Sequence, residues 1–268
     1  MGQVMSHVNT NLLLKAAVID MGIQWGCCAA AIALKTEKFY DLAGSSTFLY
    51  LTWLTLSWGN RGAIKRAFPR QLVQNTCVSV WALRLGSYLV HRVMHEGEDK
   101  RFKKAKENPS TFFVYWSMQG LWVWLTLLPT MILNIKRHNK PLGMRDYIGW
   151  GFWICGFLLQ AVADSQKSSF RSNPENKGKF ITEGLWSYSR HPNYLGEIMM
   201  WSGLFLPASS VMTGKELLSV ISPVFVMYLL TNVSGIPILE RMGEKRWGHL
   251  EEYQAYKRNT ARLIPFIW

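Results

Sequence analysis

Apolar runs close to the length of a bilayer-spanning helix limit what this chain can fold into. Hydrophobic residues make up 49% of the 268 residues, yet the mean hydropathy is only +0.02, because strongly polar connections separate the runs. A helix needs about 20 residues to cross ~30 Å of hydrocarbon. The sequence therefore predicts an all-α, polytopic membrane protein with about seven transmembrane helices in one bundle, at 12–34, 42–58, 72–90, 111–133, 147–163, 194–212 and 217–233.

The whole chain, 1–268, is predicted to be a single integral membrane domain, because no stretch outside the runs is long enough for a soluble domain. The first run contains Asp20 and Gln24 and is followed by no small-residue cleavage site, so we expect a retained span and not a signal peptide. The runs 42–58 and 147–163 are short, and either could be tilted or partly inserted. The four cysteines show no C-x-x-C spacing, which argues against a zinc or disulfide framework.

The positive charge is interpreted first as a topology signal. The chain has 30 Lys and Arg and a formal charge of +13, a balance that in a soluble protein would suggest nucleic acid. With seven spans, the loops 35–41, 91–110 and 164–193 and the tail from 234 hold 19 of these cations, whereas the opposite loops hold nine. The positive-inside rule then predicts a cytoplasmic C-terminus, and no nucleic-acid partner is expected.

The segment 182–197 is the strongest candidate for a functional site, because Arg, His, Asn and Glu lead directly into an apolar run. On a helix that begins near Asn193, the residues Asn193, Glu197 and Trp201 share one face. A carboxylate there could accept hydrogen bonds from a ribose or amide, and an indole could stack on an aromatic ring. A buried polar network that holds helices together is the alternative.

Directly upstream, Tyr188, Arg190 and His191 precede Pro192, where the chain should turn before the helix. Arg binds phosphate through two parallel hydrogen bonds, and the helix N-terminus adds backbone donors. The loop from Asp164 through Lys167, Arg171, Lys177 and Lys179 leads into the same motif and would suit a polyanionic ligand. Lipid headgroup contact, topology and a solvated charged surface are the alternatives.

Several polar residues lie inside apolar runs. Arg84, Tyr88 and Arg92 share a helix face, where the two cations need an acid or an anion between or opposite them. Asp20 with Gln24 either lines a cavity or is structural, and for Gln119 we expect an interhelical hydrogen bond. The chain has no G-x-G-x-x-G after a strand and no P-loop, so any nucleotide would be held by helices.

These residues carry a resemblance. Gly184–Trp186, Asn193–Glu197, Trp201 and the ending Leu263–Trp268 resemble the C-terminal domain of the steroid 5α-reductase superfamily over about 160–268, with an uncharacterised branch most similar. The resemblance implies a seven-helix bundle that binds NADPH from the cytoplasmic side and a lipid-like enone deeper inside. It suggests these residues as cofactor contacts: Arg92, Arg101, Asp164, Arg171, Lys179, Tyr188, Arg190, His191, Asn193, Glu197, Trp201 and Arg241.

Lys179 stands where the family usually has Arg. Its ammonium is a compact point charge, whereas a guanidinium could donate two parallel hydrogen bonds. The Arg190-His191-Pro192 run also occurs in sterol reductases and in membrane methyltransferases such as isoprenylcysteine carboxyl methyltransferase, whereas Glu197 and Trp201 favour the reductases. For the proton donor, the resemblance suggests Tyr88, with Asp20 as a substitute for a family Glu that has no counterpart here.

The sequence thus predicts an NADPH-dependent oxidoreductase that acts on the CH–CH group of a lipophilic, steroid- or lipid-like enone and needs no metal. The alternatives are an S-adenosylmethionine-dependent methyltransferase and a non-catalytic lipid or sterol binder. Membrane lipids are expected partners. The expected location is the endoplasmic reticulum in a eukaryote or the inner membrane in a bacterium.

Overall fold

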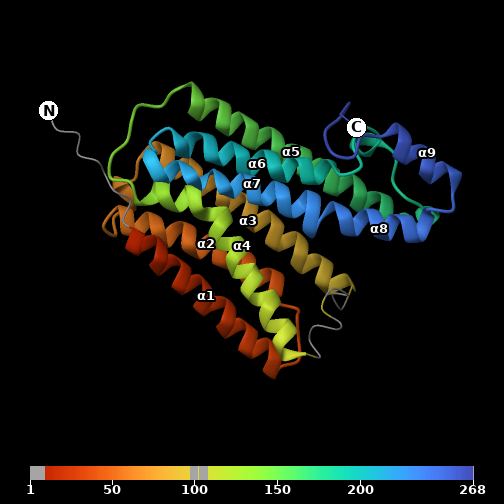
Figure 1. Ribbon diagram of the computed structural model, residues 1–268, viewed down its shortest axis with the longest axis horizontal. Helices are drawn as coiled ribbons and strands as arrows, with labels where there is room; N and C mark the ends of the chain where they lie inside the picture. Colours follow the sequence, from red (N-terminus) through yellow and green to blue (C-terminus); the bar gives the residue numbers. More distant parts are fainter. Residues whose placement is uncertain (1–9, 97–101, 103–107, 268) are drawn as a thin grey trace. The chain divides into compact units, whose positions relative to one another are not determined.

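The computed structural model describes residues 10–96, 102 and 108–267, with side chains described outside 90–96. Throughout this part of the chain the regular structure is helical, as predicted, and no strand is present (Figure 1). The α-helices are α1 (Thr10–Ala33), α2 (Tyr40–Gly59), α3 (Pro69–Glu96), α4 (Pro109–Ile135), α5 (Met144–Ser172), α6 (Pro192–Ser209), α7 (Ile221–Tyr228), α8 (Ile236–Trp247) and α9 (Glu251–Asn259).

Short helical turns connect these elements. Four are 3₁₀ helices, η1 (Ile64–Arg66), η2 (Pro174–Asn176), η3 (Gly184–Ser187) and η4 (Gly214–Val220), and η5 (Leu229–Val233) is a π-helix between α7 and α8. The chain forms two compact units, one of Met1–Asp146 with Pro207–Ser222 and one of Tyr147–Leu206 with Pro223–Trp268.

In the first unit, α4 packs against α1 and α2, and α2 also packs against α3. Aromatic rings fill part of this core, where the Phe48 ring meets the Trp81 and Trp122 rings edge-on at 4.8 Å. Gln119 Nε2 donates to the Tyr40 carbonyl oxygen (2.9 Å), so the expected interhelical hydrogen bond of Gln119 is confirmed. Close helix packing here therefore combines apolar contacts with hydrogen bonds from amide side chains.

A buried amide cluster fastens α2, α3 and α4 together. Asn134 Nδ2 donates to Thr55 Oγ1 and to Asn75 Oδ1, both at 3.0 Å, and Gln71 Nε2 donates to the Leu133 carbonyl oxygen at 2.9 Å. Because these side chains are buried, each of these bonds replaces one that would otherwise be made to water. Such amides lower the mean hydropathy of α3 without exposing polar groups to lipid.

In the second unit, α5 and α6 cross at two glycines. A Cβ atom on Gly156 would lie 2.6 Å from the Gly196 carbonyl oxygen, and one on Gly196 would lie 2.8 Å from the Gln160 backbone nitrogen. Only glycine allows the backbones to approach this closely. The crossing sets the register of α6 against α5 and therefore places the polar side chains at the start of α6.

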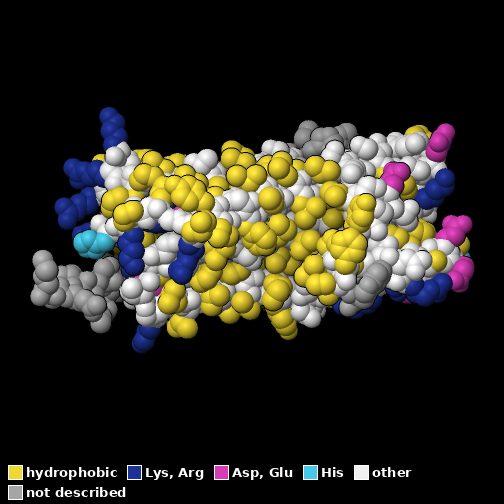
Figure 2. Space-filling model, turned by 90° about the horizontal axis from the view of Figure 1, so that it is seen from above, with side chains coloured by type: hydrophobic (Ala, Val, Ile, Leu, Met, Phe, Trp, Pro, Cys, Tyr) yellow, Lys and Arg dark blue, Asp and Glu magenta, His cyan; other side chains and the backbone are white. Residues whose placement is uncertain are grey.

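All seven predicted spans fall on helical segments, but only four helices are long and apolar enough to cross a membrane, within the residues that could be searched. These are Thr10–Ala33, Pro109–Ile135, Met144–Ser172 and Gly214–Trp247. The predicted number of seven is not confirmed, and the cytoplasmic C-terminus stays a prediction. Exposed hydrophobic side chains dominate the face shown in Figure 2, as expected of a surface in contact with lipid.

Candidate functional site

The loop between α5 and α6 is held in place by Trp186. Its indole Nε1 donates to the Ala163 carbonyl oxygen of α5 (3.0 Å), and its own carbonyl oxygen accepts from Tyr256 Oη of α9 (2.7 Å). The Lys167 ammonium lies 4.6 Å from the centre of the Trp186 ring. A buried aromatic residue thus ties α5, the loop and α9 into one wall.

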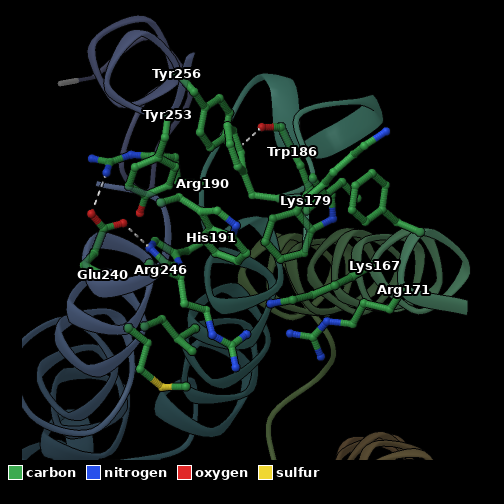
Figure 3. Close-up of a pocket in the computed structure, with 17 residues that line it drawn as sticks. Lys167, Arg171, Lys179, Trp186, Arg190, His191, Glu240, Arg246, Tyr253 and Tyr256 are labelled. Atoms are coloured by element: carbon green, nitrogen blue, oxygen red, sulfur yellow. Dashed lines mark hydrogen bonds and ion pairs between the residues drawn. The ribbon is translucent and has the colours of Figure 1, made fainter. Parts of the chain in front are cut away.

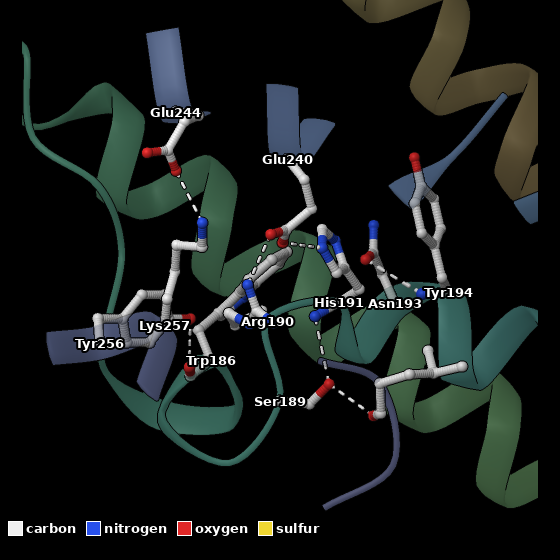
Figure 4. Close-up of polar contacts among 11 residues, drawn as sticks. Trp186, Ser189, Arg190, His191, Asn193, Tyr194, Glu240, Glu244, Tyr256 and Lys257 are labelled. Carbon is white, nitrogen blue, oxygen red and sulfur yellow. Dashed lines mark hydrogen bonds and ion pairs between the residues drawn. The ribbon is translucent and has the colours of Figure 1, made fainter. Parts of the chain in front are cut away.

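The C-terminal segment fixes the backbone just before α6. Arg190 N donates to the Ala261 carbonyl oxygen (2.9 Å). Ser189 Oγ donates to the Leu263 carbonyl oxygen (2.7 Å) (Figure 4). Ser189 and Ala261 form an isolated parallel bridge. The segment that follows α9 therefore orients Arg190 and His191 although more than seventy residues separate them in sequence.

Glu240 of α8 binds both of these side chains. One carboxylate oxygen accepts from Arg190 Nη1 at 2.6 Å, and the other lies 2.8 Å from His191 Nε2. Burial lowers the pKa of His191, and the Glu240 carboxylate opposes this change only in part. A neutral His191 that donates from Nε2 keeps Nδ1 as an acceptor, and His191 Nδ1 and Arg190 Nε are buried with no hydrogen-bond partner within the described part of the chain.

A cavity of about 150 Å³ lies beside this pair, within the second unit (Figure 3). Its walls include the aromatic side chains Phe180, Trp186, Trp247, Tyr253 and Tyr256. Burial raises the pKa of Tyr256 above its usual value, so its phenol stays protonated. The cations that line the cavity are Lys167, Arg171, Lys179, Arg190 and Arg246.

The charge of this cavity is not balanced. Of its five cations, only Arg190 forms an ion pair in the part of the chain that the structure describes, and Glu240 is the one acidic residue in the lining. Unpaired guanidinium and ammonium groups beside aromatic faces provide donors for phosphate and flat surfaces for a ring. The arrangement can hold an anionic aromatic ligand.

A second polar cluster joins α5 to α6. Asn193 Nδ2 donates to Asp164 Oδ1 (3.1 Å), Gln160 Nε2 donates to Glu197 Oε2 (2.6 Å) and Trp201 Nε1 donates to Glu197 Oε1 (2.8 Å). Asn193 follows His191 by two residues, so this cluster continues along α6 from the edge of the cavity. Both the functional and the structural interpretation of this helix face agree with these bonds.

A family model described as "Protein of unknown function (DUF1295)" matches residues 27–260. The chain belongs to this family. The DUF1295 family is part of the steroid 5α-reductase superfamily, which confirms the resemblance found in the sequence. No solved structure matches.

The curated relatives of this DUF1295 chain include proteins with different named activities. A 3-oxo-5-alpha-steroid 4-dehydrogenase 1 of Macaca fascicularis is 28% identical over 46% of this chain and 42% of its own length. A Delta(14)-sterol reductase of Mus musculus is 27% identical over 49% and 33%, and a probable O-methyltransferase of Ustilaginoidea virens is 33% identical over 44% and 39%. The chain therefore spans less than half the length of each of these relatives.

The structure brings most of the predicted cofactor contacts into one unit. Arg171, Lys179, Arg190 and His191 line the cavity, and the second cluster contains Asp164, Asn193, Glu197 and Trp201. Tyr188, 58% exposed, and Arg241, whose Nε donates to the Pro237 carbonyl oxygen, do not line it. Arg101 and the side chain of Arg92 lie outside the described residues. These assignments stay predictions.

The two predicted proton donors lie in the other unit. Asp20 of α1 is fully buried, and neither carboxylate oxygen has a hydrogen-bond partner within the described residues. Tyr88 of α3 is 38% exposed. Within the described residues no hydrogen bond joins the two side chains, so their roles stay predictions.

Sequence reasoning missed three polar side chains of the cavity and cluster as site residues: Gln160, Glu240 and Arg246. Glu240 and Arg246 lie with Gly243 on one face of α8, at spacings of three residues, and Arg241 points elsewhere. A helical-face analysis of α8 could have separated Glu240 from Arg241. Nothing in the sequence shows which face of α8 meets Arg190, because the partners are 50 residues apart.

Proposed function

We propose that this protein is a membrane-embedded, NADPH-dependent reductase that acts on an activated C=C bond of a lipophilic enone. The observation that carries the proposal is the cavity of the second unit, where four of five cations have no ion-pair partner within the described residues and aromatic rings form the walls. Relatives named as a steroid 4-dehydrogenase and a sterol reductase support an oxidoreductase.

The residues fit a phosphorylated dinucleotide. The unpaired cations are of the kinds that bind phosphates, and the buried His191 Nδ1 is an acceptor that a ribose hydroxyl or an amide could satisfy. The cavity, at about 150 Å³, is smaller than the roughly 300–1,000 Å³ of a typical small-molecule site. We therefore assign it the phosphate-bearing part of NADPH.

The second polar cluster, between α5 and α6, would bind the rest of the NADPH molecule. Glu197 and Asn193 present oxygen and amide groups at half-buried positions, and Gln160 and Asp164 of α5 hold them in place. Glu240 keeps Arg190 and His191 oriented toward the cavity. When bound, NADPH would supply a hydride to the β-carbon of the enone.

The substrate end of the proposal concerns the first unit. A group that donates a hydrogen bond to the conjugated carbonyl stabilises the charge that develops on oxygen. The buried Asp20 carboxyl, with neither oxygen bonded within the described residues, is a suitable donor in its protonated form, and Tyr88 is the other candidate. The lipophilic substrate would reach either residue from the membrane.

The test is the cofactor affinity of detergent-purified protein for NADPH, NADH and S-adenosylmethionine, measured in parallel by calorimetry. We expect selective binding of NADPH and its loss in Glu197→Gln, because the amide cannot present two acceptor oxygens to Gln160, Trp201 and the ligand. Glu252→Gln on the exposed side of α9 is the matched control. Unchanged NADPH affinity in Glu197→Gln would refute the assignment.

A methyltransferase is the second candidate, because one relative is named a probable O-methyltransferase. S-adenosylmethionine carries a sulfonium cation and no phosphate, so the surplus of positive charge around the cavity disfavours it. Selective binding of S-adenosylmethionine in the same titration would reverse this choice. Binding of none of the three compounds would favour the non-catalytic lipid binder.

The location in the cell is part of the proposal. In the described part of the chain, four helices are long and apolar enough to span a membrane, which indicates a membrane protein. The relatives named for steroids and sterols favour the endoplasmic reticulum for a eukaryotic chain. A C-terminus on the cytoplasmic side would place the cavity where NADPH is available. Protease protection of a C-terminal tag in sealed microsomes tests this orientation.

A further inference from the structure

A second basic pocket lies in the first unit, where α2 ends and α4 ends. It has a volume of about 220 Å³ and is lined by Asn60, Arg61, Arg66, Phe68 and Arg137, with Gly59. Asn60 is fixed, because its Nδ2 donates to the Leu56 carbonyl oxygen at 3.0 Å. The pocket thus has a rigid floor and three guanidinium groups on its walls.

The acidic groups nearby are already paired. The loops 59–71, 134–146 and 213–216 contain two carboxylates, Asp146 and Glu216. Arg70 binds both oxygens of Asp146, at 2.5 and 2.8 Å, and both side chains are 1% exposed. Lys136 Nζ lies 2.6 Å from the Glu216 carboxylate, also buried. Neither acid is therefore available to the three arginines of the pocket.

The remaining cations of these loops have no ion-pair partner within the described part of the chain: Arg61, Lys65, Arg66, Arg137, Lys140, Arg145 and Lys215. Figure 2 shows Lys and Arg side chains gathered at its left-hand edge, the side on which these loops lie in Figure 1. An excess of positive charge of this size attracts anions, and guanidinium forks match phosphate oxygens.

The position of the pocket favours a lipid. Arg137 follows the end of α4, one of the four helices able to span a membrane, by two residues. Hydrophobic side chains are exposed beside the basic loops, with Ile64 at 45% and Met144 at 75%. Cations next to the end of a span meet headgroups, whereas exposed apolar side chains at the same level suit the acyl boundary.

We propose that Arg61, Arg66 and Arg137 form a binding site for the phosphate headgroup of an anionic phospholipid. The site is separate from the cavity of the second unit and does not depend on the proposed reductase activity. Its role would be to anchor this end of the unit to one membrane leaflet.

The test compares three ligands on the full-length, detergent-purified chain: dioctanoyl phosphatidic acid, dioctanoylglycerol, which lacks the phosphate, and inorganic phosphate. We expect binding of phosphatidic acid, weakened by added salt, and none of dioctanoylglycerol. A cation near a membrane surface contributes roughly a fivefold gain in affinity, so Arg61→Gln, Arg66→Gln and Arg137→Gln together should weaken binding about a hundredfold.

The matched control removes the same number of charges elsewhere, as Lys177→Gln, Lys245→Gln and Arg262→Gln, at exposed positions that line neither pocket. Its affinity for phosphatidic acid should stay within a few-fold of the parent. Equal loss in both triple variants, or no loss in the arginine variant with an unchanged thermal midpoint, would overturn the proposal. Inorganic phosphate binding as tightly as phosphatidic acid would overturn the lipid assignment in favour of a soluble anion.

Discussion

The α5–α6 crossing gives a sharp test of the structure, through Gly156→Ala. The new Cβ atom would lie 2.6 Å from the Gly196 carbonyl oxygen and 2.8 Å from the Met199 Cβ, against about 3.5–4.0 Å for a comfortable contact. The obstacles are a backbone atom and a Cβ, which no rotamer change can move. The helices must therefore separate by roughly 1 Å, and overpacking of this kind costs about 1–3 kcal/mol.

Gly151→Ala is the control in the same helix, because a Cβ atom there meets nothing within 4 Å. It should be neutral or stabilise the helix by up to about 1 kcal/mol, the difference in helix propensity between the two residues. Because the gain in helix propensity is common to both substitutions, the two alanine variants should differ by the overpacking cost of about 1–3 kcal/mol, or by roughly 2–12 °C in thermal midpoint for a chain of this size.

The assay is thermal unfolding in one detergent at one scan rate, because such unfolding is often irreversible and the midpoint then depends on the rate of heating. NADPH affinity is measured on the same samples. Gly196 adjoins Glu197, so separation of the helices should also disturb the Gln160–Glu197 hydrogen bond and lower the affinity for NADPH. Equal midpoints for Gly156→Ala and Gly151→Ala would refute the close crossing.

Two further predictions concern buried ionisable side chains. His191 has a lowered pKa in the folded protein, so the unfolded chain takes up a proton first as the pH falls below about 6.5, and stability should fall from there until the folded-state pKa is passed. Thermal midpoints between pH 8 and pH 5 should show this decline, and His191→Gln should reduce it. Asp146→Asn leaves Arg70 buried with its ion pair broken and should cost about 3–5 kcal/mol. A loss under 1 kcal/mol in an unfolding measurement would show that Arg70 reaches water.

The fold could be predicted from the sequence to the extent that apolar runs report helices. Each of the seven runs lies on helical segments, and α6 begins at Pro192, one residue from the expected start. The number of spans is harder to obtain, because the amides Gln71 and Asn75 of α3 pair with Asn60, just after α2, and with Asn134 of α4 only after the helices pack. A hydropathy scale assigns each such residue the full cost of placing a polar group in the membrane, because the scale takes no account of a hydrogen-bond partner on another helix.

The site shows the same limit. The period of a helix placed Asn193, Glu197 and Trp201 on one face, and the Trp201–Glu197 bond lies within that face. Their partners Asp164 and Gln160 lie on α5, 29 and 37 residues earlier, where no periodicity connects them. Local pattern therefore identifies which residues share a face, whereas the identity of the opposing face depends on how the helices pack.

The distribution of charge carries this argument further than the net charge does. A formal value of +13 treats all 30 cations alike, yet the structure removes Arg70 and Lys136 from the field that a ligand meets, because each is buried and paired with a carboxylate. Within the described residues, both cavities are lined by cations that have no ion-pair partner, because the acids nearest to them are already bound. A count along the chain can suggest the topology of the loops. Only the pairing shows where an anion would bind.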